Sequence, residues 1–251
     1  MELTRYLISA GFQCSKSDTS LFILCQSDCI VYLLVYVDDI IVTGNVSAAV
    51  SNIIAGLAHR FSLKDLGNLH YFLGIEVAPC DAGLFLSQHK YVSDLLLETN
   101  MHDSKGVATP MNSETVLMPA AKDSIVDATR YRKIVGKLQY LSFTRPDIAY
   151  PVNKLAQFMH SPGLEHWQAL KRLLRYLNHT IDYGLCLVRE RNPSLFVYSN
   201  ADWAGDPSDR ASTTGYITYL GSTPISWSSK KQKVVSRSST EAEYRYVRCI
   251  L

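Results

Sequence analysis

The sequence predicts an α+β fold, in which strands and helices occupy separate stretches of the chain. Three observations support this prediction. Short β-branched segments bounded by turn residues dominate residues 21–87, apolar stripes with helical spacing dominate residues 131–178, and short strand-like segments return after residue 184. Runs of strands that alternate with runs of helices are typical of α+β proteins rather than of a parallel α/β sheet.

The first part of the chain is expected to contain strands, three helices and one conspicuous glycine. Apolar spacing and turn residues predict helices over 3–10, 47–60 and 88–98, and strands over 21–25, 29–37, 40–43, 69–77 and 84–87. Gly11 ends the first helix, as glycine often does. Gly74 interrupts the alternation of strand 69–77 and indicates a bulge or a close backbone approach.

The middle and last parts change from helices to a meander. Residues 100–127 lack periodicity and are expected to form a linker, and helices are predicted over 131–143, over residues from 148 to 158, and over 164–178. Thr144 is expected to cap the second of these, and Thr240 a last helix. Strands over 184–188, 195–199, 215–220 and 224–227 would form one antiparallel meander, followed by a basic loop over 228–239. The expected domains are 1–108, 109–180 and 181–251.

Composition is that of an ordinary globular protein with an uneven charge. The 251 residues are 47% hydrophobic and 19% charged, with a net charge of +2. Residues 1–129 hold 7 Lys and Arg against 14 Asp and Glu, whereas residues 130–251 hold 18 against 9. This asymmetry indicates either a nucleic-acid partner for the basic half or a generic solubilising surface.

Location and redox state are predicted from what the sequence does not contain. No apolar run reaches the roughly 18 residues of a membrane span, and residues 1–5 do not begin a secretory signal. The six cysteines are scattered without paired metal-ligand spacing. We therefore expect reduced thiols in an intracellular protein, in a cytoplasmic particle or in the nucleus, without membrane contact.

Two adjacent carboxylates, Asp38 and Asp39, lie between two apolar strand-like runs. They are expected at the tip of a β-hairpin. Two buried acids without a counter-charge would be costly, so the tip is either solvated or holds a divalent cation. A wet turn is the simpler alternative, since Asp favours turns. Mg²⁺ would take these oxygens and keep positions open for phosphate.

Eight stretches, in this order, resemble the Pol polyprotein of copia-type LTR retrotransposons. They are YVDDIIVTG at 36–44, FSLKDLG at 61–67, YFLGIEV at 71–77, GKLQYL at 136–141, TRPDI at 144–148, ADWAGD at 201–206, SWSSKKQ at 226–232 and SSTEAEY at 238–244. The resemblance covers nearly the whole chain. It implies a partial reverse-transcriptase palm with an antiparallel sheet and helices, then a helical thumb or connection region, then a truncated RNase H-like mixed sheet.

The resemblance also assigns roles to residues. It implies that Asp38 binds catalytic Mg²⁺ with the support of Asp39, and that Glu241 is a metal-binding acid of the RNase H-like part. Residues near the primer end would be Tyr36, Val37, Phe72, Leu73 and Gly74. Where the family has its first RNase H acid this chain has Asn200, and Asp202, two residues further along, is the remaining candidate metal ligand there. An amide is a poorer ligand for a hard cation.

Basic residues supply a second set of candidates. Lys171, Arg172 and Arg175 lie off the apolar stripe of their helix, and Lys230, Lys231 and Lys233 follow the last predicted strand. They could bind the phosphates of a template–primer or an RNA–DNA hybrid. A solvated helix face is the alternative for the first three.

The resemblance also leaves family features unmatched. A third palm carboxylate, the nucleotide-binding fingers and further RNase H acids have no counterpart in the sequence. We therefore expect the isolated chain to lack processive polymerase and RNase H activity. Two alternatives to an enzyme fragment are a non-catalytic nucleic-acid-binding module and a non-functional relic. Another Pol chain could also complete the protein.

Overall fold

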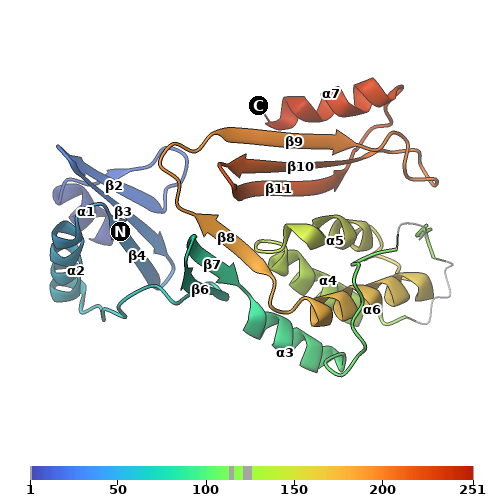
Figure 1. The fold of residues 1–251 in the computed structure, drawn as a ribbon, viewed down its shortest axis with the longest axis horizontal. Helices are drawn as coiled ribbons and strands as arrows, with labels where there is room; N and C mark the ends of the chain where they lie inside the picture. Colours follow the sequence, from blue (N-terminus) through green and yellow to red (C-terminus); the bar gives the residue numbers. More distant parts are fainter. Residues whose placement is uncertain (1, 113–115, 121–125, 251) are drawn as a thin grey trace. The chain divides into compact units, whose positions relative to one another are not determined.

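The computed structural model describes residues 2–112, 116–120 and 126–250, and it divides the chain into two units. The first unit covers residues 1–72 and the second residues 73–251. Figure 1 shows the elements of both, and each unit is described by itself. The structure is α+β, and every strand pair it gives is antiparallel.

The first unit is an antiparallel sheet with two helices. Its elements are α1 (Glu2–Ser9), β1 (Gln13–Cys14), β2 (Leu21–Gln26), β3 (Cys29–Tyr36), β4 (Asp39–Gly44), α2 (Ser47–Phe61) and β5 (Tyr71–Phe72). The strands β1 to β4 pair in chain order. These elements confirm the helices and strands expected over residues 3–60, with small shifts at their ends.

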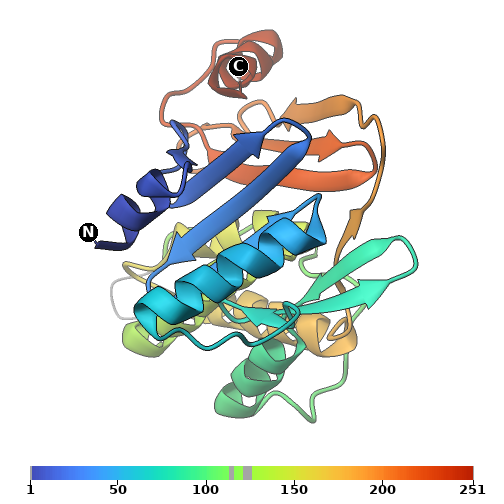
Figure 2. The same ribbon diagram turned by 90° about the vertical axis from the view of Figure 1, so that its left-hand side faces the viewer.

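One face of this sheet forms the core of the first unit, and the other carries exposed tyrosines. Val31 and Leu33 of β3 are fully buried and belong to one apolar cluster with Leu7 of α1 and Leu57 of α2. Figure 2 shows α2 lying along the sheet. Because side chains alternate along a strand, Tyr32 and Tyr36 point to the opposite face, where 43% and 47% of their surface is exposed.

The second unit contains a three-stranded sheet, a helical core and a further three-stranded sheet. Its elements are β6 (Ile75–Cys80), β7 (Gly83–Ser87), α3 (His89–Thr99), α4 (Ala128–Leu141), the 3₁₀ helix η1 (Pro146–Ile148), α5 (Ala149–Ala156), α6 (Leu164–His179), β8 (Gly184–Val188), β9 (Leu195–Ala201), β10 (Thr213–Leu220), β11 (Thr223–Lys231) and α7 (Ser239–Ile250). The sheet orders are β6-β7-β8 and β11-β10-β9.

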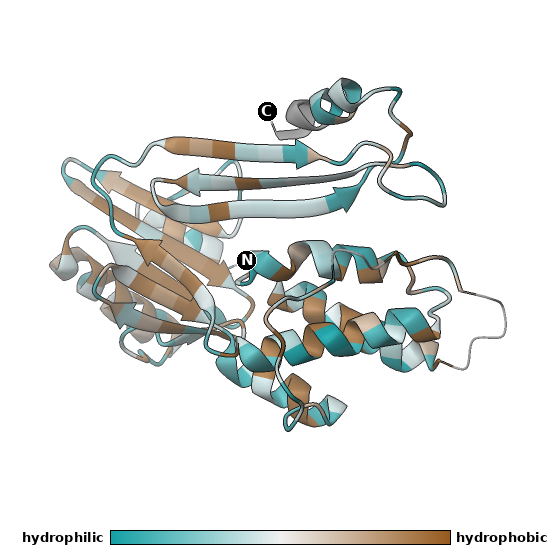
Figure 3. Ribbon diagram, turned by 45° about the vertical axis from the view of Figure 1, so that its right-hand side comes forward, coloured by the Kyte–Doolittle hydropathy of each residue, from teal (hydrophilic) through white to brown (hydrophobic). Residues whose placement is uncertain are grey.

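Helices α3 to α6 bury one continuous core. The apolar stripes predicted from helical spacing meet there, with Leu138 of α4, Leu155 of α5 and Leu170 of α6 fully buried. The hydroxyl of Tyr131 donates to the carbonyl oxygen of Leu155 at 2.9 Å, which satisfies the one polar atom of a buried ring. Figure 3 shows the brown, apolar stripes of these helices beside teal, polar ones.

Three predictions about local structure were wrong. The strand expected over 69–77 is broken between β5 and β6, because Leu73 and Gly74 both have positive φ, 49° and 74°. Thr144 does not cap a helix; its hydroxyl donates to the side chain of Gln88 at 2.7 Å. The cap of α7 is Ser238 rather than Thr240, since the Ser238 Oγ accepts the N–H of Glu241 at 3.1 Å.

The meander expected after residue 184 was also wrong in its extent. β8 pairs with β7, so only β9, β10 and β11 form the second sheet of the described residues. The mixed pairing expected there does not occur among these strands, which are all antiparallel. β11 continues to Lys231, so Lys230 and Lys231 lie on a strand and not in the basic loop. The described part of residues 100–127 contains no helix or strand, as predicted for a linker.

Glu98 of α3 forms an exposed ionic link to α4. It contacts Lys133 at 2.6 Å and also contacts Lys137, and hydrogen bonds from these two lysines lower the pKa of Glu98 to about 2. Its side chain is 37% exposed, so solvent screening keeps the stabilisation small.

We expect Glu98→Gln to lower the free energy of unfolding by less than about 1 kcal/mol at pH 7. Because the folded-state pKa is depressed, the contribution is present above the ordinary glutamate pKa of about 4.3 and is lost as the pH falls toward 2. Urea unfolding of both proteins at pH 7 and at stepwise lower pH measures this. Glu243→Gln, at an exposed glutamate, is the control. A difference that persists unchanged at pH 2.5 would contradict the ionic origin.

Candidate nucleic-acid interface

The two adjacent acids lie at the tip of the β3–β4 hairpin, as the sequence predicted. Tyr36 pairs with Asp39 across the hairpin, so Val37 and Asp38 form its two-residue turn. The register is set by the pairs below it, in which β-branched and apolar residues face each other along both strands. All four residues from Tyr36 to Asp39 are exposed, and the exposed fraction of Val37 is 83%. The carboxylates are therefore presented to solvent on a rigid support.

Val37 has an unfavourable backbone conformation. Its φ of 52° is in the left-handed region, which β-branched residues rarely adopt because Cβ crowds the backbone. Backbone strain of this kind costs on the order of 1–3 kcal/mol and is frequent at functional sites. The strained residue, Val37, directly precedes Asp38 in the two-residue turn of this hairpin.

Two aromatic candidates of the first unit contact each other near this tip. The rings of Tyr36 and Phe72 have centroids 6.2 Å apart and meet edge to face at 76°. The structure therefore brings together Tyr36, Asp38, Asp39 and Phe72 within one unit. Leu73 and Gly74 belong to the second unit, where a Cβ on Gly74 would lie 3.0 Å from the Tyr140 hydroxyl. Glycine therefore suits this position, because a side chain there would have a strained φ and would crowd the Tyr140 hydroxyl.

The hairpin tip presents two acidic side chains next to each other. Asp38 and Asp39 offer hard carboxylate oxygens on one turn, which suits Mg²⁺. Within residues 2–112, 116–120 and 126–250, however, no three His, Cys, Asp or Glu side chains gather as a metal-binding group.

In the second unit, Asp202 and Glu241 have separate partners. The Asp202 carboxylate accepts the N–H of Thr213 just beyond β9. Glu241 accepts the N–H of Arg237 at 2.6 Å and pairs with Arg245 at 2.7 Å, and these contacts lower its pKa despite some desolvation. The Asn200 side chain accepts the N–H of Ala201 at 2.9 Å.

Two of the three basic candidates on α6 hold the segment that follows α3. The Arg172 Nη2 donates to the Thr109 hydroxyl at 2.7 Å, and the Arg175 Nε donates to the carbonyl oxygen of Lys105 at 2.6 Å. Lys171 is exposed, with its Nζ 5.9 Å from the Trp167 ring centroid. These contacts give Arg172 and Arg175 a structural role that apolar periodicity could not reveal.

The lysines that follow Ser229 differ in how much of their charge remains free. Lys231 Nζ lies 2.7 Å from Asp206 and 2.8 Å from Asp209, so its charge is already paired. Lys230 and Lys233 are exposed, and neither belongs to an ion pair among the side chains that the structure describes.

Comparison with known proteins relates this geometry to a family. Residues 1–113 match the family model for reverse transcriptase (RNA-dependent DNA polymerase). The chain is 57% identical over 247 residues to the retrovirus-related Pol polyprotein from transposon RE1 of Arabidopsis thaliana, and this match covers 98% of the chain and 17% of the relative. It is also 34% identical to the putative transposon Ty5-1 protein YCL074W of Saccharomyces cerevisiae, over 93% of the chain and 77% of that protein.

The chain belongs to the Pol family of copia-type retrotransposons. Its first part is a reverse transcriptase-like domain. The whole chain spans 17% of the length of the RE1 polyprotein. An uncharacterized mitochondrial protein of Arabidopsis thaliana, AtMg00810, is 46% identical over 85% of this copia-type chain and 89% of its own length. No solved structure matches the chain. A helix long and apolar enough to cross a bilayer does not occur in the described part of it.

Proposed function

We propose that this chain supplies the metal-binding hairpin of a retrotransposon reverse transcriptase and binds the primer end of a template–primer. The exposed hairpin tip, with Asp38 and Asp39 beside the Tyr36–Phe72 ring pair, carries this proposal. Nucleotidyl transfer needs carboxylates that hold Mg²⁺ against phosphate oxygens. In this role Asp38 and Asp39 hold the ion, while Tyr36, Val37 and Phe72 contact the primer end.

The proposal extends to the domain plan. Residues 1–108 are assigned to the palm, 109–180 to a helical thumb or connection region, and 181–251 to a truncated RNase H-like domain. The open sheet face with Tyr32 and Tyr36 supports the first assignment, because a face without covering helices can accept a ligand. The buried helices α4 to α6 support the second. The helix α7, which has Glu241 in its first turn and contacts β9, supports the third.

Catalysis by this chain in isolation is not part of the proposal. Asp38 and Asp39 have no third acid beside them among the described residues. Glu241 pairs with Arg245, and Asp202 accepts a hydrogen bond from Thr213, so each of these two acids has its own partner. Template-dependent primer extension with Mg²⁺ should therefore be absent, and so should cleavage of the RNA strand of a hybrid. Incorporation of nucleotides above background by purified protein would refute the first statement, and hybrid cleavage the second.

Binding of a template–primer duplex tests the proposal directly. We expect binding that weakens as salt rises, because phosphate contacts release counterions. The double variant Lys230→Glu/Lys233→Glu should weaken binding and lower the slope of log K against log salt concentration by about 2, since each phosphate contact contributes roughly 0.9. Fluorescence anisotropy with a labelled duplex measures both values.

The matched control is Lys16→Glu, at an exposed lysine in the acidic first half of the chain. It should leave affinity and slope nearly unchanged. Equal losses in all variants would indicate a general charge effect, and unchanged binding in the double variant would remove these lysines from the interface.

A non-catalytic nucleic-acid-binding module is the second candidate. The free charges of Lys230 and Lys233, together with Asn200 in place of an acid, favour it. The two candidates differ at the hairpin. Under this second function, Asp38→Asn would have no effect on how a divalent ion interacts with the bound complex.

A further inference from the structure

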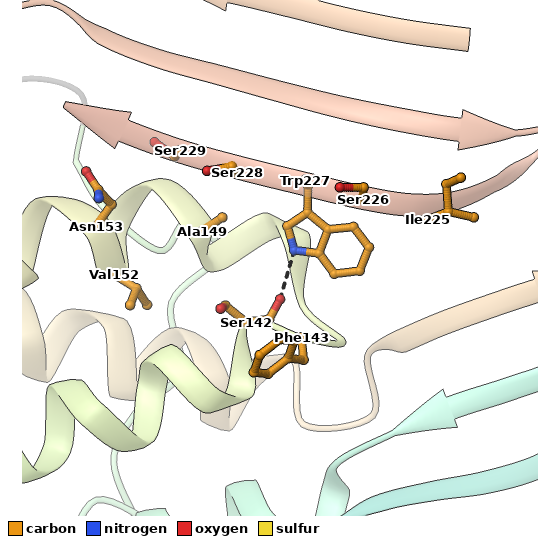
Figure 4. A pocket seen from close by; sticks show the side chains of 10 residues that line it. All are labelled: Ser142, Phe143, Ala149, Val152, Asn153, Ile225, Ser226, Trp227, Ser228 and Ser229. Carbon is orange, nitrogen blue, oxygen red and sulfur yellow. Dashed lines mark hydrogen bonds between the residues drawn. The ribbon is translucent and has the colours of Figure 1, made fainter. Parts of the chain in front are cut away.

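A groove in the second unit runs between α5 and the sheet of β9, β10 and β11. Two adjoining cavities of about 400 and 510 Å³ form it, and they share the lining residues Ala149, Trp227, Ser228 and Ser229. Figure 4 shows the smaller one, with Ala149 and Asn153 of α5 across from Ser228 and Ser229 of β11. Because both cavities lie within one unit, the groove is a feature of that unit's own fold.

Three aromatic rings face the larger cavity. Tyr150, Tyr198 and Trp227 line it, whereas the Tyr216 ring lies on the other face of the sheet, because its strand neighbour Ile217 pairs with both Tyr198 and Trp227. The indole N–H of Trp227 donates to the carbonyl oxygen of Ser142 at 2.8 Å, which fixes the ring, as the dashed line in Figure 4 shows. Tyr198 meets Tyr219 edge to face at 6.0 Å and keeps 62% of its surface exposed, and Tyr150 keeps 47% exposed. The rings of Trp227 and Tyr198 are thus held by neighbouring groups, and Tyr198 and Tyr150 present accessible surface.

The polar lining is neutral except for one carboxylate. Two hydroxyls and an amide supply most of it, from Thr213, Ser229 and Asn200, and Asp202 supplies the charge. Neither cavity is lined by a lysine or an arginine. Burial and the nearby Asp202 raise the pKa of Tyr150, so its hydroxyl remains a donor at neutral pH. This lining disfavours phosphate and suits a flat ring with donors and acceptors on its edge.

We propose that this groove binds unpaired nucleobases of a single-stranded nucleic acid, which stack on Tyr198 and Tyr150. Every base has a π-face, and stacking on exposed aromatic side chains is how single strands are commonly held. The phosphates remain outside, where the surplus of basic residues in 130–251 complements their charge and where the exposed Lys230 directly follows Ser229. Bases within a duplex are already stacked and paired, so the groove discriminates against duplex.

This inference goes beyond the proposed polymerase role and uses neither Asp38 nor Asp39. Anisotropy with a labelled oligothymidylate, alone and annealed to its complement, tests it. We expect the single strand to bind at least about 5-fold more tightly than the blunt duplex. Tyr198→Ala should weaken single-strand binding by about 5- to 100-fold, since one stacked base contributes roughly 1–3 kcal/mol, while Tyr198→Phe should retain it.

Tyr244→Ala is the matched control, because Tyr244 is a tyrosine of α7 with 72% of its surface exposed and does not line the groove. It should leave single-strand binding unchanged. Thermal melting of each variant establishes that it is folded.

Equal affinity of Tyr198→Ala, Tyr150→Ala and the wild type for the single strand would overturn the inference. So would a Tyr198-dependent interaction with a proline-rich peptide in place of the oligonucleotide. Loss of template–primer binding with single-strand stacking preserved would instead count against the proposed polymerase role alone.

Discussion

Replacement of Arg145 by alanine is expected to lower the free energy of unfolding of the second unit by about 3–5 kcal/mol, the usual result of removing one partner from a buried ion pair. The Arg145 side chain is only 2% exposed. Its Nε and Nη2 donate to the two carboxylate oxygens of Asp147 at 2.9 and 2.7 Å, and its Nη1 donates to the carbonyl oxygen of Thr180 at 3.0 Å. Alanine would remove the charge partner of Asp147 and three of the hydrogen bonds that hold this cluster together.

The loss should extend across the helical core, because Arg145 links its elements. Asp147 also accepts the Tyr176 hydroxyl at 2.8 Å, and Thr180 follows α6, so this cluster connects the start of η1 to the end of α6. For a unit of this size, about 2–4 °C of melting temperature corresponds to 1 kcal/mol, so a drop of roughly 6–20 °C is expected.

Thermal melting followed by circular dichroism measures the Arg145 effect. Arg145→Lys serves as a second variant should alanine prevent folding, and it should lose part of the stability because an ammonium lacks the forked geometry of guanidinium. Arg132→Ala is the control, since the two hydrogen bonds recorded for that exposed side chain are long, at 3.4 Å. Equal melting temperatures for Arg145→Ala and Arg132→Ala would show that the buried cluster contributes little.

Asp206→Asn is expected to have the second largest effect, a loss of about 3 kcal/mol. The Asp206 side chain is 4% exposed and receives Lys154 at 3.2 Å and Lys231 at 2.7 Å. Burial by itself would raise the pKa of Asp206, but hydrogen bonds from Lys231, Ser208 and Lys154 outweigh it and hold the pKa well below the ordinary range. An amide would leave the partly buried Lys154 ammonium without a counter-charge and would leave Lys231 only the exposed Asp209.

The same pKa shift predicts a pH dependence. Since the folded-state pKa of Asp206 is depressed, its contribution is fully present above the unfolded value of about 3.9 and is lost as the pH falls below it. The difference in stability between wild type and Asp206→Asn should therefore begin to shrink below about pH 4 and should close only as the pH nears the depressed folded-state pKa. Asp209→Asn is the matched control, because Asp209 contacts the same Lys231 at 2.8 Å but is 55% exposed, and its loss should cost less than about 1 kcal/mol. Equal losses for Asp206→Asn and Asp209→Asn would contradict the role of burial.

The sequence correctly predicted the helices and strands that bury one face, because burial of one face produces a regular spacing of apolar residues. Helices α2 to α6 and strands β2 to β4 appear where apolar spacing placed them, because each has one buried stripe or face. The sequence-based prediction failed between β5 and β6, where Leu73 and Gly74 both adopt positive φ. Leucine rarely adopts a positive φ, so only Gly74 indicated the break in the strand.

The sequence could not predict partners that lie far apart in the chain. β8 was expected beside β9, yet it pairs with β7, from which it is separated by the whole helical core. The cap was expected at Thr144, and only the fold shows that the neighbouring Arg145 is buried against Thr180. The hairpin with Asp38 and Asp39 was predictable because all its determinants are local. The groove along β11 was not, since α5 and the sheet supply it jointly.

Divalent-ion binding at the hairpin tip tests the central claim most directly. In ¹⁵N-labelled protein bound to a template–primer, substoichiometric Mn²⁺ should selectively broaden the backbone amide signals of residues 36–40, and more strongly than in the free protein, because primer phosphates add ligands to Asp38 and Asp39. Asp38→Asn should abolish that selective broadening while it preserves duplex binding. Broadening that is centred elsewhere, or that is the same in Asp38→Asn, would contradict the assignment of this hairpin as a metal-binding element.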